Sequence, residues 1–255
     1  MNRKNKICRI NIITVTNGKV NALSKTLRSI DNQNYKNYKN LIITSKKLNK
    51  LHKKFRTRRR FFFYQKNSSI YEAMNYGLKR SKRKFLIFLN SGDTFSSKSS
   101  LKKISHYTNN FKIKSCLMLV SILKHGDNYF FPKKKVFFSK KFLTHSSFIR
   151  PPSQDDSGYD IKNKITADGI WMNSNIKKFG IKKIYAPLSI FYLGGISNFP
   201  SKKSLMMKAN NGTSVILKEL VKFILLKIVG VNNFYKIIYC FKYNRVSYNK
   251  MKNIE

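Results

Sequence analysis

Hydrophobic positions along this chain fall into two patterns, and their order predicts strands that alternate with helices. Residues 10–16 are β-branched almost throughout and stop at Asn17-Gly18, so they predict a buried strand. Apolar residues at spacings of four and three then predict a helix over residues 20–32, and residues 41–44 predict a second strand. The three segments form a βαβ unit, whose crossover we expect to be right-handed and whose strands we expect to be parallel.

The alternation continues beyond a basic stretch. Residues 45–60 are strongly basic and lack clear periodicity, which indicates a loop or a loose helix. Residues 61–64 predict a third short strand, and Ser69 is a typical N-cap for a helix that we predict over residues 70–82. The first half of the chain therefore has the pattern of an α/β domain.

Five consecutive apolar residues, 85–89, lead into the turn Asn90-Ser91-Gly92-Asp93. A continuous apolar run predicts a strand that is buried on both faces, as in a parallel sheet covered by helices. Ligands bind just outside the carboxyl ends of such strands, so Asp93 is a candidate ligand-binding acid. The residues alone leave a second interpretation open, in which Asp93 is an ordinary turn residue.

The pattern changes in the second half, where regular α/β alternation stops and polar candidates are few. We predict a helix over residues 101–107 and strands over 115–123 and 129–138 that are joined by a turn at 125–128. Residues 142–150 carry His145, and Pro151-Pro152 breaks any regular structure after them. We also predict a helix over 166–178 that opens on Asp168 and an apolar strand over 184–191.

The tail contains a further helical segment. Residues 214–229 are apolar nearly all round, but four charged residues interrupt them, which makes the segment too charged to span a bilayer. Such a helix either lies in the membrane interface with its lysines toward anionic headgroups or docks as an ordinary helix on the domain. The sequence leaves both possibilities open.

Composition narrows the class of protein. The 255 residues are 42% hydrophobic and carry a formal net charge of +43, so we expect a folded but very basic protein. Lysine supplies 42 of the 53 basic residues and arginine 11, and the lysines are not gathered in one patch. Because arginine is the side chain suited to bidentate phosphate recognition, a solvated basic surface is favoured over a nucleic-acid interface. Three distant cysteines form neither a disulfide framework nor a metal-ligand spacing.

Several motifs, taken in order, resemble those of family 2 glycosyltransferases of the GT-A fold, especially the branch of bacterial polysaccharide synthesis. The matching segments are the first strand from Ile12 to Asn17, the run Ile70-Tyr71-Glu72-Ala73-Met74-Asn75 with Gly77, the motif Phe88-Leu89-Asn90-Ser91-Gly92-Asp93, the pair Ala167-Asp168, and Leu193-Gly194-Gly195-Ile196-Ser197. The resemblance covers roughly residues 7 to 200. It implies a mixed, Rossmann-like α/β sheet flanked by helices, with a C-terminal helical appendage.

The resemblance also implies a division into domains. Residues 1–200 would form the GT-A domain, with a nucleotide-sugar half over 1–95 and an acceptor-side half over 96–200. Residues 201–255 would form a basic amphipathic helical tail. We expect a cytoplasmic protein, since no signal peptide precedes the first strand, with peripheral contact to an anionic inner membrane face as an open possibility.

The implied activity is an inverting, hexosyltransferase-like transfer of sugar from a nucleotide-diphosphate donor to a glycan or lipid-linked acceptor in cell-surface polysaccharide synthesis. Asp93 would bind a divalent metal, Mg or Mn, which stabilises the diphosphate leaving group. Asp168 would take the proton of the acceptor hydroxyl. The remaining implied site residues are Thr16, Asn17, Tyr71, Asn75, Asn90 and Ser91 on the donor side and His145 on the acceptor side.

The chain also departs from the family pattern. Residues 44–48 lack the acid that usually follows the second strand, residues 67–69 lack an acid-glycine pair, and no aromatic residue follows Thr16. These departures leave open a member with altered donor specificity, in which lysines hold the diphosphate, and a catalytically degenerate member of the same fold. A basic nucleic-acid-binding protein is the alternative from another class, although we expect no nucleic acid partner.

Overall fold

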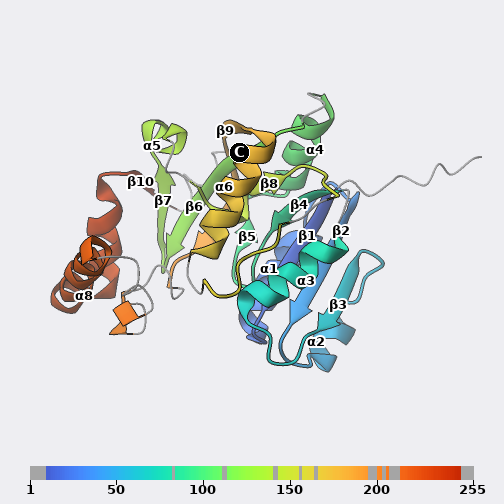
Figure 1. Ribbon diagram of the computed structural model, residues 1–255, viewed down its shortest axis with the longest axis horizontal. Helices are drawn as coiled ribbons and strands as arrows, with labels where there is room; N and C mark the ends of the chain where they lie inside the picture. The colour runs from blue at the N-terminus through green and yellow to red at the C-terminus, as the bar shows by residue number, and fades with distance from the viewer. Residues whose placement is uncertain are drawn as a thin grey trace, which may run out of the picture.

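The computed structural model describes residues 10–81, 84–110, 114–139, 143–154, 157–163, 166–194, 200–202, 205–206 and 213–247. One mixed sheet runs through these residues, with helices on both of its faces (Figure 1). The strand order along the main path is β10-β7-β6-β8-β4-β1-β2-β3, and β9 pairs with both β5 and β6. The predicted α/β class with a mixed sheet is confirmed.

The first half of the chain builds the parallel part of the sheet. Its elements are β1 (Ile10–Thr16), α1 (Val20–Asp31), β2 (Tyr38–Thr44), α2 (Asn49–Lys54), β3 (Arg60–Tyr64), α3 (Ile70–Arg80) and β4 (Phe85–Phe88). Strand β1 lies between β2 and β4 and is parallel to both, and β3 adds to β2 in the same direction. Because β1 and β4 are parallel neighbours, their carboxyl ends meet at one edge of the sheet.

The second half adds mostly antiparallel strands. Its elements are β5 (Thr94–Phe95), α4 (Ser100–Asn110), β6 (Cys116–His125), β7 (Asn128–Pro132), α5 (Lys134–Phe138), the 3-10 helix η1 (His145–Ser147), β8 (Phe148–Arg150), α6 (Ala167–Phe179), β9 (Ile181–Tyr192), α8 (Thr213–Cys240) and β10 (Tyr243–Val246). Strand β8 pairs antiparallel with both β4 and β6, which joins the two halves into one sheet.

The alternation of residues along β1 divides the core between the two faces of the sheet. Ile13 and Val15 pack with α3 and α6 in one hydrophobic cluster, whereas Ile10 and Ile12 pack with α1 and α4 in another. Successive side chains of a strand point to opposite faces, so a strand that is covered on both sides buries apolar residues on both of its faces. All seven residues of β1 are buried.

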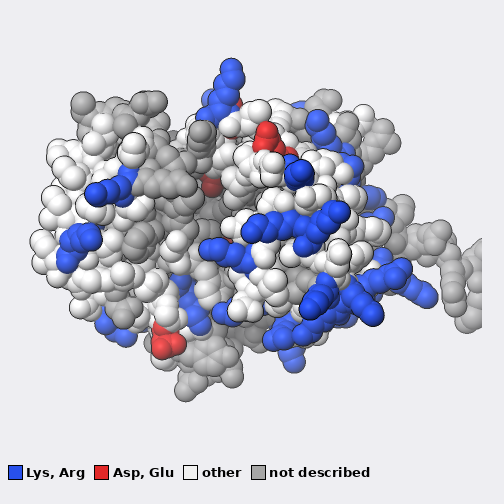
Figure 2. Space-filling model, turned by 90° about the horizontal axis from the view of Figure 1, so that it is seen from below, with Lys and Arg blue, Asp and Glu red and all other residues white. Residues whose placement is uncertain are grey.

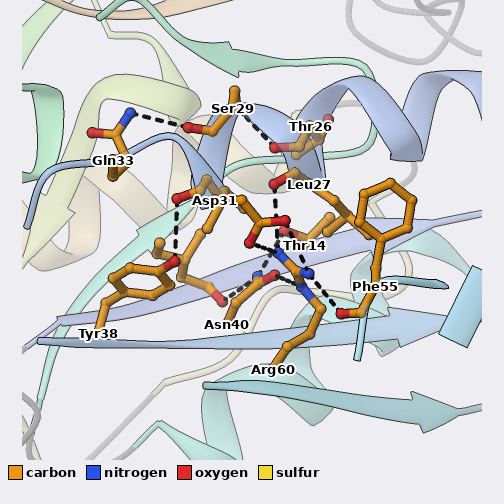
Figure 3. A network of polar contacts seen from close by, with 12 residues as sticks. Thr14, Thr26, Leu27, Ser29, Asp31, Gln33, Tyr38, Asn40, Phe55 and Arg60 are labelled. Atoms are coloured by element: carbon orange, nitrogen blue, oxygen red, sulfur yellow. Dashed lines mark hydrogen bonds and ion pairs between the residues drawn. The ribbon is translucent and has the colours of Figure 1, made fainter. Parts of the chain in front are cut away.

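A buried polar network ties β3 to its neighbours, and the centre of this network is Arg60 (Figure 3). The Arg60 side chain is 1% exposed and forms an ion pair with Asp31 at the end of α1, at 2.8 Å. Its guanidinium also donates to Asn40 Oδ1 of β2 at 3.2 Å and to the Phe55 carbonyl at 2.7 Å. Asn40 in turn donates to Thr14 Oγ1 of β1 at 3.1 Å. A charge this deeply buried is tolerated because it is paired and hydrogen-bonded.

Several details differ from the sequence prediction, among them the short strands β5 and β8, which were not predicted. The strand predicted over 129–138 is wrong in its second part, because β7 ends at Pro132 and residues 134–138 form helix α5. Proline has no N–H to donate to a strand ladder, so it commonly ends one. The tail also contributes β10, which pairs antiparallel with β7 and was not predicted. Across the described ranges, α8 included, every helix is too short or too polar to cross a bilayer.

Candidate active site

The turn that carries Asp93 lies at the carboxyl ends of β1 and β4. The backbone N–H of Ser91 donates to the Val15 carbonyl at 3.0 Å, so the turn follows β1 beyond the end of β4. Thr26 of α1 fixes it from the other side, since its hydroxyl accepts from the Gly92 N–H at 2.9 Å and donates to the Asp93 carbonyl at 2.7 Å. Gly92 has a φ of 110°, a backbone conformation that residues other than glycine rarely adopt.

The Asp93 side chain is buried, with 6% of the residue exposed. Its Oδ1 accepts the backbone N–H of Tyr192, at the end of β9, at 3.2 Å. Burial raises the pKa of Asp93 to about 7, and the hydrogen bond from Tyr192 opposes that rise. Asp93 is therefore a carboxyl group held at the sheet edge in surroundings with little water.

Two further oxygens beside Asp93 have no hydrogen-bond partner among the described residues. They are Asn90 Oδ1 and Ser91 Oγ, and both atoms are buried. A buried polar atom without a partner costs free energy, which is why such atoms are uncommon in folded proteins. Carboxylate, amide and hydroxyl oxygens are the ligands that Mg²⁺ and similar hard cations prefer, so this turn offers a chemically suitable donor set.

Two lysines lie near Tyr192, whose backbone N–H contacts Asp93. The Lys25 Nζ is 5.8 Å and the Lys124 Nζ 5.7 Å from the centroid of the Tyr192 ring. Lys25 also lines a pocket of about 830 Å³ that opens between α1, α2 and the segment that follows β2. The cationic residues that line this pocket are Lys25, Arg28, Lys47, Lys50 and Lys54. Figure 2 shows lysine and arginine side chains gathered over one half of the face that it draws, with few acidic side chains among them.

The second candidate carboxylate, Asp168, lies in the first turn of α6 and is partly exposed. Its Oδ1 accepts the backbone N–H of Gly169 at 2.8 Å. Its negative charge acts on two neighbours, Tyr71 and His145. Burial raises the pKa of Tyr71 to about 12, and the charge of Asp168 adds to that rise. Asp168, Tyr71 and His145 therefore form one electrostatic group.

These neighbours belong to an aromatic cluster, which we define as Tyr71, Phe88, His145, Tyr159 and Trp171. Tyr159 is its centre, because its ring stacks on Trp171 with centroids 4.9 Å apart and on Tyr71 with centroids 5.6 Å apart. The Tyr159 hydroxyl lies 2.6 Å from His145 Nε2. Burial lowers the pKa of His145 to about 4, against an opposing effect of Asp168, so the imidazole is neutral at physiological pH.

Asn75 of α3 holds the backbone of Tyr159 in place. Its Nδ2 donates to the Tyr159 carbonyl at 2.9 Å, and its Oδ1 accepts the Tyr159 N–H at 2.6 Å. The contact requires a glycine at position 158, since a Cβ there would lie 2.6 Å from Asn75 Oδ1. Both polar ends of the Asn75 side chain are thus used within the protein.

Thr16 and Asn17 shape the turn between β1 and α1. Thr16 is 4% exposed, and its Oγ1 accepts the Gly18 N–H at 3.1 Å. Asn17 is exposed, and its Oδ1 accepts the Lys19 N–H at 3.4 Å. Both residues lie at the same sheet edge as the Asp93 turn.

The structure thus groups the sequence-predicted residues into two sets. Thr16, Asn17, Asn90, Ser91 and Asp93 lie at the carboxyl ends of β1 and β4, and Tyr71, Asn75, His145 and Asp168 lie around the aromatic cluster. Phe88 links the sets, because its ring stacks on His145 with centroids 4.7 Å apart while its strand leads into the Asp93 turn. The predicted motif at 193–197 lies outside the described residues beyond Gly194.

Sequence reasoning missed Tyr159, Trp171, Tyr192, Lys25 and Lys124. The one available signal was that Trp171 is the single tryptophan of the chain, three residues beyond Asp168 on the predicted helix. No motif marked the others, because their roles depend on contacts between segments far apart in the chain. In the described part of the chain, no group of three or more His, Cys, Asp or Glu side chains converges.

The fold is the GT-A fold of glycosyltransferases, as solved structures show. The crystal structure of S. aureus TarS 1-349 in complex with UDP-GlcNAc is similar with a TM-score of 0.62 and 12% sequence identity, over 84% of this chain and 66% of that one. TarS 1-349 without a named ligand gives a TM-score of 0.57 at 12% identity, over 72% of this chain and 60% of that one.

A mannosyltransferase from another organism is also similar in structure. The mannosyltransferase PcManGT from Pyrobaculum calidifontis, in complex with GDP-Man and Mn²⁺, gives a TM-score of 0.53 at 11% identity, over 80% of this chain and 60% of that one. The chain therefore spans about three fifths to two thirds of the length of these proteins. No protein-family model matches the sequence, and no curated protein matches it either.

Proposed function

We propose that this protein is a family 2-like glycosyltransferase that moves a sugar, with inversion, from a nucleotide-diphosphate donor to a glycan or lipid-linked acceptor. The observation that carries the proposal is the Asp93 turn, in which a buried carboxyl and two unpartnered oxygens lie together at the carboxyl ends of β1 and β4. In open α/β sheets this edge is where ligands bind. The resemblance to GT-A glycosyltransferases supports a donor-binding role for the same edge.

The donor set of this turn suits a divalent metal. Asp93 would supply the carboxylate, and Asn90 Oδ1 and Ser91 Oγ would supply neutral oxygens. One carboxylate is enough for Mg²⁺ or Mn²⁺ when the substrate's phosphates and water complete the coordination. A bound metal would stabilise the negative charge that develops on the diphosphate as the glycosidic bond breaks.

The lysines around Tyr192 would contribute to the same task. The ammonium groups of Lys25 and Lys124 lie within 6 Å of the centroid of the Tyr192 ring, and the backbone N–H of Tyr192 donates to Asp93. Fixed positive charge near the leaving group favours the transition state, in which charge accumulates on the diphosphate. Lys47, at the wall of the neighbouring pocket, follows β2 where the family usually has an acid. We propose that these lysines take over part of donor recognition, beside Thr16 and Asn17.

Asp168 would act as the catalytic base. The acceptor hydroxyl must lose its proton as its oxygen attacks the anomeric carbon, and a carboxylate at the start of α6 can accept that proton. Direct attack by the acceptor on the face opposite the leaving group gives inversion. His145 and Tyr71, both neutral, would pack beside the acceptor and would not compete with Asp168 for the proton of the acceptor hydroxyl. Asn75 would act as a positioning residue through Tyr159.

Transfer of labelled sugar tests the proposal directly. The full chain is incubated with Mn²⁺, a panel of uridine and guanosine diphosphate sugars, and glycan or polyprenyl-phosphate acceptors. Asp93→Asn and Asp168→Asn are compared with Asp127→Asn, a control in the β6–β7 turn. We expect both site variants to lose at least about a hundredfold in kcat, because removing a base or a charge-stabilising group costs this much.

Donor binding, measured by calorimetry, separates the two roles. Asp93→Asn should abolish the Mn²⁺-dependent part of nucleotide binding, whereas Asp168→Asn should retain it. Wild-type activity in either site variant would refute the assigned roles. Metal-dependent nucleotide binding without transfer to any acceptor would instead identify a catalytically degenerate member of the fold.

A further inference from the structure

Helix α8 lies at the end of the molecule opposite β3 and is bent at Gly230, whose φ of 72° is not helical (Figure 1). One side of the helix docks on the β6–β7 hairpin. Leu226 packs there with Leu123 of β6 and Phe130 of β7 in a separate hydrophobic cluster. This docked side fixes the rotation of the helix about its own axis.

The opposite side of α8 before the bend is apolar and exposed. Five residues share it, with exposed fractions of 62%, 42%, 57%, 49% and 75%: Leu217, Leu220, Val221, Ile224 and Ile228. Their spacings of three and four put them on one face of a helix, and we call this face the outer stripe. Isolated exposed apolar residues are ordinary, but a continuous stripe of five marks a surface that contacts something apolar.

Positively charged residues on both sides of the outer stripe indicate what kind of surface it binds. At about 100° of rotation per residue, Lys218 and Lys227 lie roughly 90° to either side of the outer stripe. The acid in this segment, Glu219, is 6% exposed and paired with Lys222 at 2.7 Å, so it lies on the docked side. In Figure 2 the α8 end of the molecule, at the left, shows fewer lysine and arginine side chains than the opposite end.

We infer that the first segment of α8 is an in-plane anchor that binds an anionic lipid bilayer, with the outer stripe in the acyl region and Lys218 and Lys227 at the headgroups. Lysine stems reach along the apolar face while their ammonium groups stay at the phosphate level. A second copy of the chain is a poorer occupant, because it would bring the flanking lysines of two molecules with a formal charge of +43 together. The inference goes beyond the proposed sugar transfer and does not depend on it.

Cosedimentation of the full chain with vesicles tests this anchor. The vesicles contain phosphatidylcholine alone or with about one third phosphatidylglycerol, a fraction that gives a strongly negative surface. We expect binding to the anionic vesicles and little to the neutral ones. Because so basic a protein would also adsorb through charge alone, the deciding variant changes no charge.

That variant is Ile224→Ser with Ile228→Ser, and its control is Ile161→Ser, which is 51% exposed, close to the 49% of Ile224, but lies in the loop before α6. The outer-stripe variant should bind at least about tenfold more weakly, since it loses most of two buried aliphatic side chains, while the control binds as the wild type does. Lys218→Gln with Lys227→Gln should weaken binding by about fivefold for each lysine removed.

Three results would overturn the inference. The first is wild-type protein that does not bind anionic vesicles, and the second is an outer-stripe variant that binds as well as its control. The third is self-association of the wild type in sedimentation velocity that the outer-stripe variant loses, which would assign the stripe to a second copy. Circular dichroism confirms that each variant is folded, and the exposed positions make unfolding unexpected.

Discussion

The buried imidazole of His145 should make the stability of this protein depend on pH in a defined window. His145 is 7% exposed, stacks on Phe88 and contacts the Tyr159 hydroxyl, and burial lowers its pKa from 6.5 to about 4. The unfolded chain therefore binds a proton at this imidazole below about pH 6.5, whereas the folded chain does not until about pH 4. Stability that is fully present above pH 6.5 is lost as the pH falls toward 4.

The size of the loss follows from the two pKa values. Each pH unit inside the window is worth about 1.4 kcal/mol, so lowering the pH from about 7.5 to about 5 should cost about 2 kcal/mol of unfolding free energy at this one site. Urea denaturation of the wild type and of His145→Gln at both pH values measures it. The variant, whose amide does not titrate, should be less stable at neutral pH but should lose about 2 kcal/mol less on acidification.

Comparison with a second histidine makes the test specific. His52→Gln, at an exposed position in α2, should retain the pH dependence of the wild type. An equal pH dependence in wild type and His145→Gln would refute the reasoning, because it would show that His145 titrates alike in the folded and unfolded chains. The test compares the pH dependence of the unfolding free energy between wild type and variant, because the repulsion among the many lysines is common to both and cancels.

Two other predictions concern polar contacts that hold the fold around the site. Asp31→Asn should lower the unfolding free energy, measured in urea, by about 2 kcal/mol. This loss is smaller than that for a fully buried pair, because the Asp31 side chain is 37% exposed. An unchanged unfolding free energy would show that Arg60 does not need the negative charge of Asp31. Asn75→Ala leaves the Tyr159 N–H and carbonyl without their partner and should cost about 2 kcal/mol. Gly158→Ala should reproduce that loss in the same assay, because its methyl group would displace the Asn75 amide, and a stable Gly158→Ala protein would contradict the proposed contact.

Sequence reasoning succeeded where burial alone decides the pattern. Strands β1 and β4 are covered on both faces, so β1 is rich in β-branched residues and β4 is a continuous apolar run, and both patterns are visible without a structure. It failed where tertiary contacts decide. Val136, Phe137 and Phe138 have strand-like side chains, yet they form α5, which lies against β9 and whose Phe137 carbonyl accepts from the Lys183 ammonium group. Strand β10 exists because β7 offers it an edge.

The candidate site divides in the same way. Asp93 follows directly from a buried strand, so its place at the sheet edge was predictable. Tyr159 was not, because its position depends on Asn75, which is 84 residues away in the chain. Local sequence gives no sign of a contact over that distance. The aromatic cluster shows that the surroundings of a predicted residue such as His145 are harder to predict than the residue itself.

The few acidic side chains of the chain are held in different ways. Asp31 pairs with a buried arginine, Glu219 pairs with a lysine, Glu72 completes the capping box of α3, and Asp160 accepts the backbone N–H of Lys162. Among the described residues, no lysine or arginine forms an ion pair with Asp93 or Asp168, although the chain carries 53 basic residues. Each accepts a backbone N–H instead. A buried carboxylate without a counter-charge is costly, so Asp93 is the acid that a bound metal ion would stabilise, whereas the partly exposed Asp168 is accessible to the acceptor hydroxyl of the proposed sugar transfer.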